Sequence, residues 1–289
     1  MKSFTLAFAL FFAGVGLAYC EALTSIHPDG PGEYTMSVND LDVHVSIQLV
    51  GETEETSDWV AKLTIYEDGA QTFQHEFEDY FSPVFGPIAH IVEMDDTNGS
   101  LEVVAATYSG GAHCCTQPVV MTKTGGDWKL LPAGSFDGDF SSVSLSDLDG
   151  DGLSELQALD IRFFYEFAPY AGSFAPIQIL GMRDGEVKDV TSEEVYEWSV
   201  RDAFGRIITI PDNGEERNSW LATYAAYLLL LGEDDPLDFA LASHDASVDW
   251  GMTKCTVEEV DFVCPDGKSE NVGFEAALTE FLTETGYLR

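Results

Sequence analysis

The chain has 289 residues, and its 13 lysines and arginines against 51 aspartates and glutamates give a formal charge of −38. This excess of carboxylates excludes nucleic acid and anionic membrane surfaces as main partners, because both would repel the chain. Hydrophobic residues make up 45% and aromatic residues 12% of the chain, which is enough for a packed core and excludes a disordered acidic tail.

The N-terminal segment 1–22 is typical of a secretory signal peptide. Met1-Lys2-Ser3 supplies a short positive start, and residues 4–18 form an apolar run that is too short to span a bilayer comfortably. Cleavage after Cys20 and cleavage after Ala22 both fit, and acylation of Cys20 is a further alternative. No later stretch reaches the roughly 18 uninterrupted apolar residues of a membrane span. We therefore expect a periplasmic or secreted protein.

Residues 23–190 have the pattern of a β-rich region. Pairs of β-prone stretches are joined by turns that contain glycine, which is a hairpin signature. The central glycines of these turns, Gly69, Gly126 and Gly185, recur at a nearly constant spacing. Such a spacing predicts repeated structural units, each with a few short strands.

An acidic loop at residues 147–155 predicts a metal site. Carboxylates at alternate positions of a tight turn converge on one point, and Gly150 and Gly152 permit the backbone conformations that the turn requires. Hard oxygen ligands in this number suit Ca²⁺ better than Zn²⁺ or Mg²⁺. The flanking stretches are strand-like, so we expect a strand–loop–strand site rather than an EF-hand. The expected ligands are the side chains or carbonyls of Asp147, Asp149, Asp151, Leu153 and Glu155.

A second acidic loop, at residues 95–102, predicts a weaker site. Aligning Gly99 with Gly152 superposes the two loops, but Met94 then stands in the place of the first aspartate. The expected ligands of a second ion are the side chains of Asp96, Asn98 and Glu102.

The loop at 147–155 resembles the calcium loops of FG-GAP and VCBS-type repeats, which occur in exported bacterial proteins and in integrin α-chain propellers. The resemblance rests on the pattern Asp-x-Asp-x-Asp-Gly-x-x-acid, which runs here from Asp147 to Glu155. It implies a calcium-stabilised, β-propeller-like domain that serves mostly for binding, without fixing the number of blades.

Residues 191–289 are mainly helical in pattern. Helices are expected at residues 191–205, 220–231, 235–242 and 273–283. Because strands and helices are segregated, the sequence predicts an α+β fold, with a propeller-like β-rich region and a helical region packed on it. The segment 220–231 is too apolar to remain exposed, so we expect the two regions to form one unit.

The cysteines predict disulfides, because an even number remains in an oxidising compartment once Cys20 has been removed. Cys255 and Cys264 flank a short turn and favour a local bridge. This leaves the adjacent Cys114 and Cys115, for which we favour a vicinal disulfide. Longer pairings, and a transition-metal or redox site that includes His113, remain alternatives.

The sequence contains no convincing catalytic constellation. Its six histidines show no metal-ligand spacing on a helix, and paired carboxylates are too common here to identify a glycosidase. We expect a non-enzymatic, calcium-stabilised binding protein with a protein or glycan ligand. The resemblance adds inhibition of a cell-wall hydrolase as an analogy, and the acidic surface favours a basic partner. The alternative is an exported hydrolase with an acidic cleft, and the sequence does not predict the oligomeric state.

Overall fold

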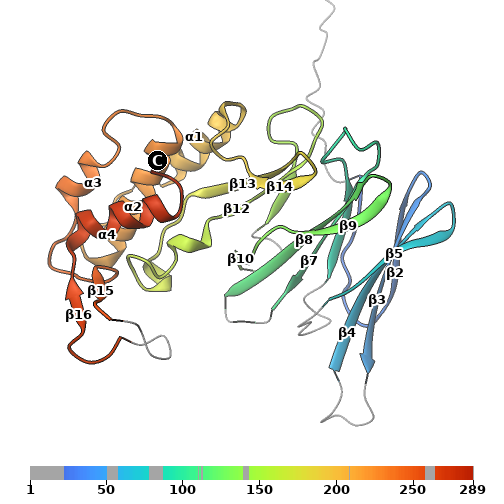
Figure 1. Ribbon diagram of the computed structural model, residues 1–289, viewed down its shortest axis with the longest axis horizontal. Coiled ribbons are helices and arrows are strands. Elements are labelled where there is room, and N and C mark those ends of the chain that lie inside the picture. Colours follow the sequence, from blue (N-terminus) through green and yellow to red (C-terminus); the bar gives the residue numbers. More distant parts are fainter. Residues whose placement is uncertain are drawn as a thin grey trace, which may run out of the picture.

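A computed structural model describes residues 23–50, 58–77, 87–109, 111, 113–138, 143–207, 209–257 and 264–288 of the chain. The predicted signal peptide lies outside these residues. The described part is rich in strands up to Asp189 and mainly helical after it (Figure 1). This segregation confirms the predicted α+β class.

The strands up to Asp189 form stacked antiparallel sheets, which we call the first, central and third sheets. The first sheet has the order β2 (Gly32–Val38), β3 (Leu41–Val50), β4 (Asp58–Glu67), β5 (Ala70–Phe77). The central sheet has the order β1 (Thr24–Ile26), β6 (Ile88–Val92), β7 (Glu102–Tyr108), β8 (Cys114–Thr124), β10 (Phe136–Asp137), and β8 also pairs with β9 (Asp127–Pro132). The third sheet has the order β11 (Ser144–Ser146), β12 (Glu155–Leu159), β13 (Ile177–Arg183), β14 (Glu186–Asp189).

The central sheet is buried on both faces. Successive side chains of a strand point to opposite faces, so neighbours on β7 enter different cores. Val103 and Ala105 pack in the cluster shared with the first sheet, whereas Val104 packs in the cluster shared with the third sheet. This explains why the sequence of β7 is a continuous apolar run rather than an alternating one.

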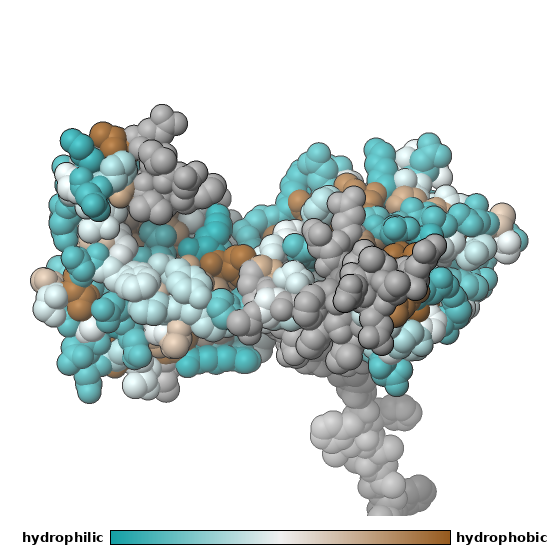
Figure 2. Space-filling model, turned by 90° about the horizontal axis from the view of Figure 1, so that it is seen from below, coloured by the Kyte–Doolittle hydropathy of each residue, from teal (hydrophilic) through white to brown (hydrophobic). Residues whose placement is uncertain are grey.

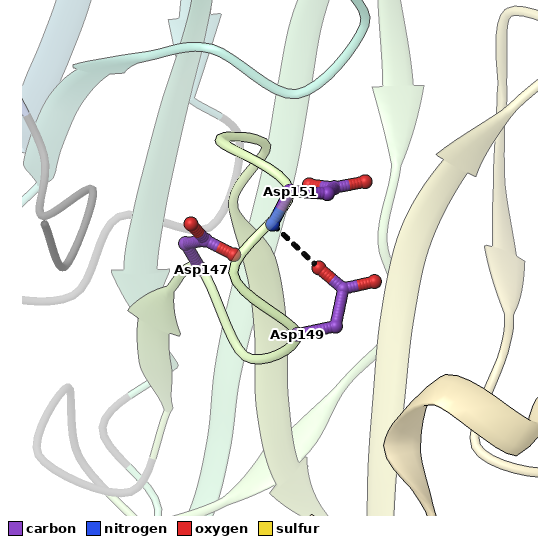
Figure 3. Close-up of side chains that lie close together, drawn as sticks. All are labelled: Asp147, Asp149 and Asp151. Carbon is purple, nitrogen blue, oxygen red and sulfur yellow. Dashed lines mark hydrogen bonds between the residues drawn. The ribbon is translucent and has the colours of Figure 1, made fainter. Parts of the chain in front are cut away.

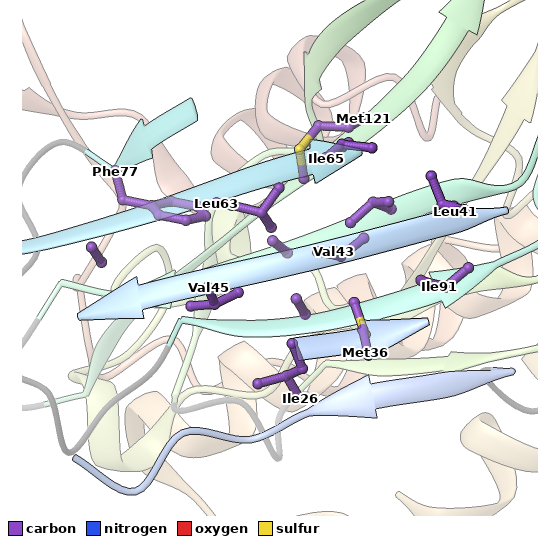
Figure 4. Packing of buried hydrophobic residues seen from close by; sticks show 14 of the residues in the cluster. Ile26, Met36, Leu41, Val43, Val45, Leu63, Ile65, Phe77, Ile91 and Met121 are labelled. Carbon is purple, nitrogen blue, oxygen red and sulfur yellow. The ribbon is translucent and has the colours of Figure 1, made fainter. Parts of the chain in front are cut away.

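The core between the first and central sheets is shown in Figure 4. Val43 and Ile65 of the first sheet face Ile91 and Met121 of the central sheet, and all four side chains are buried. Large-to-small substitutions of such buried aliphatic side chains typically cost about 2–5 kcal/mol. The contact therefore fixes the first sheet firmly against the central one.

The outer face of the third sheet is covered by helices. Ile177 and Ile179 of β13 pack with Tyr196, Val200 and Tyr227. The hydroxyl of Tyr227 also accepts a hydrogen bond from the backbone N–H of Ile177, at 3.1 Å. The helices are α1 (Glu197–Arg206), α2 (Gly214–Leu230), α3 (Asp238–Ser243) and α4 (Gly273–Glu284). Shorter elements are the 3-10 turns Ile161–Phe163 and Tyr170–Gly172, both between β12 and β13, the 3-10 turn Glu194–Tyr196 before α1, and the hairpin of β15 (Thr253–Cys255) and β16 (Ser269–Asn271).

The prediction of a β-propeller-like arrangement is wrong. Hairpins do turn at Gly69, Gly126 and Gly185, but each belongs to a different sheet. The sheets formed by the described residues stack in an open row, from the first sheet at one end to the helices at the other, as Figure 1 shows. The row does not close, because α1 and α2 cover the third sheet where a further blade would pack.

The surface agrees with the composition. Figure 2 shows two lobes joined by a narrower middle, with a mostly hydrophilic surface on which hydrophobic residues form small separate areas. None of the helices in the described ranges has the length and apolar character needed to cross a membrane.

Candidate metal centre

The loop between β11 and β12 brings carboxylates together as the sequence predicts. One ligand atom each from Asp147, Asp149 and Asp151 lies within 4.8 Å of the others, and Figure 3 shows the three side chains around the turn. Gly150 and Gly152 have φ values of 83° and 93°, in the left-handed region that glycine adopts without strain. The alternate spacing and the glycines together produce this convergence.

Backbone N–H groups of the loop hold these carboxylates in place. Asp147 accepts hydrogen bonds from the N–H groups of Gly150 and Gly152, at 2.7 and 3.0 Å. Asp149 accepts one from the N–H of Asp151 at 3.1 Å, the dashed line in Figure 3. Asp151 accepts one from the N–H of Leu153 at 2.8 Å. Because an ionised carboxylate offers about four lone-pair positions, acceptor capacity remains for a cation.

Glu155, the first residue of β12, is nearly fully buried beside the loop, with 2% of its surface exposed. Its Oε2 accepts a hydrogen bond from the N–H of Leu148 at 2.9 Å, and its carboxylate also accepts one from the hydroxyl of Tyr196. Burial raises the pKa of Glu155 to about 7, and the charges of Asp149 and Asp151 raise it further. Burial also raises the pKa of Asp149. The loop thus concentrates negative charge that hydrogen bonds only partly offset.

The donor set fits a hard cation. Carboxylate oxygens with a backbone carbonyl are the ligands that Ca²⁺ prefers, in six- to eight-fold coordination. Among the described residues, the three loop aspartates form a convergent group of the kind that holds a metal ion. The participation of the Leu153 carbonyl and of Glu155 stays a prediction.

The second acidic loop is arranged differently around its own buried acid, Glu102, which is fully buried at the start of β7. Its Oε2 accepts from the N–H of Met94 at 2.8 Å, and its Oε1 accepts from the Asn98 amide at 2.6 Å and the Thr122 hydroxyl at 2.8 Å. Protein donors therefore engage both oxygens of Glu102. A second ion at Asp96, Asn98 and Glu102 stays a prediction.

The cysteines form disulfides in the described part of the chain. Cys255 in β15 is bonded to Cys264, with a Cα–Cα distance of 5.5 Å. Cys115 is disulfide-bonded as well, so it does not offer the thiolate that the alternative metal site requires. The side chain of Cys114 lies outside the described residues, and the predicted Cys114–Cys115 bridge stays a prediction.

A cluster around His113 was not foreseen from the sequence. The Nε2 atom of His113 lies 3.0 Å from the hydroxyl of Tyr165, and its ring stacks on Tyr170 with a centroid distance of 3.7 Å. Tyr170 donates a hydrogen bond to Asp137 at 2.7 Å, which raises the pKa of Tyr170 to about 12. These residues come from the position just before β8, from β10 and from the connection between β12 and β13, so no local spacing in the sequence signals the cluster.

Among the comparisons with known proteins, a family model matches the helical half of the chain. A family model described as the sll0997 C-terminal domain matches residues 199–286, which run from α1 to α4. Over 214 residues the chain is 35% identical to "Probable thylakoid lumen protein sll0997" of Synechocystis sp., with 72% of this chain and 62% of that protein covered. It is 31% identical over 202 residues to "Uncharacterized protein y4bJ" of Sinorhizobium fredii, with 68% and 32% covered. No solved structure matches the chain.

These findings overturn the resemblance to FG-GAP and VCBS-type repeats. The family model that matches is a different one, and the sheets do not close into a propeller. The short acidic loop pattern was therefore not specific to that family, because any tight turn that gathers carboxylates produces it. Residues 199–286 are similar to the sll0997 C-terminal domain, and the chain spans less than two thirds of the length of either relative.

Proposed function

We propose that this chain is an exported, non-enzymatic binding protein whose β-sheet region is stabilised by one calcium ion at residues 147–155. The observation that carries the proposal is the convergence of Asp147, Asp149 and Asp151, with ligand atoms within 4.8 Å of one another. When bound, the ion supplies positive charge and fixed coordination rather than chemistry on a substrate. Its ligands would be Asp147, Asp149, Asp151 and Glu155 with the carbonyl of Leu153.

Export is supported by observations that do not depend on the metal. The N-terminal segment has the charge and apolar length of a signal peptide. Disulfide bonds, of which Cys255–Cys264 is one, persist in oxidising compartments. The Synechocystis relative is described as a probable thylakoid lumen protein. We propose that this chain also works in a compartment beyond the cytoplasm, such as the periplasm or the cell exterior.

Calcium would act on stability through the buried acid. An ionised Glu155 in a nearly fully buried position is costly unless a cation lies close, since burial disfavours the charged form. The ligating loop connects β11 to β12, so an ion there would tie the end of one strand to the start of the next. The proposed ion therefore stabilises the edge of the third sheet.

The test is thermal unfolding of the purified protein in excess chelator and in calcium. Calcium at about one hundred times its Kd should add about 2.7 kcal/mol to the free energy of unfolding. Asp149→Ala, which removes the ligand, should abolish this difference, whereas Asp127→Ala, at an exposed acid outside both acidic loops, should leave it intact. Identical melting curves of the wild type in chelator and calcium would refute the proposed function.

A further inference from the structure

A groove with a volume of about 640 Å³ lies on the outer face of the third sheet, beside α1. On β12, Leu156 and Ala158 pack toward the central sheet, so the alternating Gln157 and Leu159 point to the other face and line the groove. The opposite wall is formed by α1. Phe164 and Phe174, from the connection between β12 and β13, and Tyr227 of α2 also line the groove. Pockets of about 300–1,000 Å³ are typical of small-molecule sites.

Large apolar side chains at this groove remain exposed. Trp198 of α1 has 75% of its surface exposed, and Leu159 of β12 has 43% exposed, and both line the groove. A tryptophan in that position leaves apolar area in water that an incoming ring would cover. The groove is thus an apolar, aromatic-rich site open to solvent.

The described residues that line the groove offer no unpaired charge, and the charge of the molecule disfavours an anionic occupant. The acid and the base that line it, Asp202 and Arg206, form an ion pair with each other at 2.6 Å, so neither provides an unpaired charge for a ligand. The formal charge of −38 repels anions from the whole molecule. Polar contacts remain available from Gln157 and from hydroxyls such as that of Ser199.

The groove is also joined to the acidic loop. Leu148, which lines the groove, belongs to that loop and donates its N–H to Oε2 of Glu155 at 2.9 Å. The same carboxylate accepts a hydrogen bond from Tyr196, which directly precedes α1, the helix that carries Trp198. One buried carboxylate therefore contacts both the loop side and the helix side of the groove.

We infer that this groove binds an uncharged aromatic small molecule, and that calcium at the loop strengthens this binding by fixing Leu148 and α1 through Glu155. The inference rests on the proposed calcium site for its coupling, and it names the ligand class and the site of the binding function. Because coupling between two sites is reciprocal, the ligand also raises the affinity for calcium by the same factor.

The probe is N-phenyl-1-naphthylamine, an uncharged aromatic amine whose fluorescence rises in apolar sites, titrated into purified protein in calcium and in chelator. We expect saturable binding with a Kd at least fivefold lower in calcium, the lower end of typical coupling. The anionic analogue 8-anilinonaphthalene-1-sulfonate should bind at least tenfold more weakly than the neutral probe in both conditions.

Because Trp198 is mostly exposed, replacing it should leave the fold intact. Trp198→Ala should weaken probe binding at least tenfold, whereas Phe239→Ala, which removes a 45% exposed aromatic side chain on α3, should leave it unchanged. Binding that is insensitive to Trp198→Ala, or equally tight in calcium and chelator, would overturn the inference. The melting temperature in calcium and chelator, measured on the same samples, shows separately whether the calcium site itself exists.

Discussion

Glu155→Gln is the change whose effect should reverse sign with calcium. The pKa of Glu155 is about 7 in the folded protein, against an ordinary value of 4.5, because the carboxyl is buried. A raised pKa in the folded state favours folding at low pH, and this contribution is lost as the pH rises from 4.5 to 7. At pH 8 without calcium, ionising Glu155 should therefore cost the folded protein about 3 kcal/mol, and at pH 5 less than about 1 kcal/mol.

The amide of glutamine has the same shape and no charge. Its oxygen can still accept from the N–H of Leu148, but its nitrogen cannot accept from the hydroxyl of Tyr196, which costs about 1 kcal/mol. In chelator at pH 8, Glu155→Gln should therefore be about 2 kcal/mol more stable than the wild type. In saturating calcium the order should invert, because the variant lacks one anionic ligand and loses most of the added stability.

Urea unfolding followed by tryptophan fluorescence measures both conditions. The curves are recorded at pH 5 and pH 8 in chelator, and then at pH 8 in calcium, with Glu194→Gln as an exposed control that should not differ from the wild type. A variant that is no more stable than the wild type in chelator at pH 8, or equally stabilised at pH 5 and pH 8, would refute the reasoning about the buried charge.

Further outcomes test other parts of the fold. A chain that ends at Val190 should aggregate or lose its cooperative melt, because it exposes the apolar outer face of the third sheet; a soluble 23–190 fragment with a sharp transition would instead show two domains. Burial lowers the pKa of His90 to about 4, so protonation of His90 should by itself cost about 3 kcal/mol as the pH drops from 6.5 to 4, and the stability of the wild type minus that of His90→Leu should fall by this amount over that range. Replacing Cys255 and Cys264 by serine should cost about 2–3 kcal/mol in urea unfolding, and non-reducing peptide mapping should show the bridge in the wild type.

Local patterns predicted local structure well. The hairpin turns at Gly69, Gly126 and Gly185 are present because a glycine turn between β-prone stretches needs little from the rest of the chain. The helices of the C-terminal half were also expected, although α2 begins earlier than predicted. Asn218 and Ser219, which precede the expected segment 220–231, lie buried inside the helix. The amide of Asn218 bonds instead to the backbone of Asp245, a contact that no local pattern reveals.

The arrangement of the sheets could not be predicted from the sequence patterns. Equal spacing of hairpins fits a closed ring and an open stack alike, because both repeat a short antiparallel unit. What distinguishes them is the neighbour of the last sheet, and that depends on long-range contacts such as Ile179 with Val200. The convergence of the loop carboxylates was predictable, since it needs only five consecutive residues. The groove beside Trp198 was not, because its walls come from segments far apart in the chain.

The stacked layers follow one another in space in nearly the same order as in the chain. The first sheet is complete at β5, the central sheet follows, then the third sheet and the helices (Figure 1). A chain that emerges from its N-terminus can therefore build each layer on the one already formed, with few long loops to close. The exception is β1, which must wait for β6 before it can pair. The strand that emerges first should thus be among the last of its sheet to gain protection from hydrogen exchange.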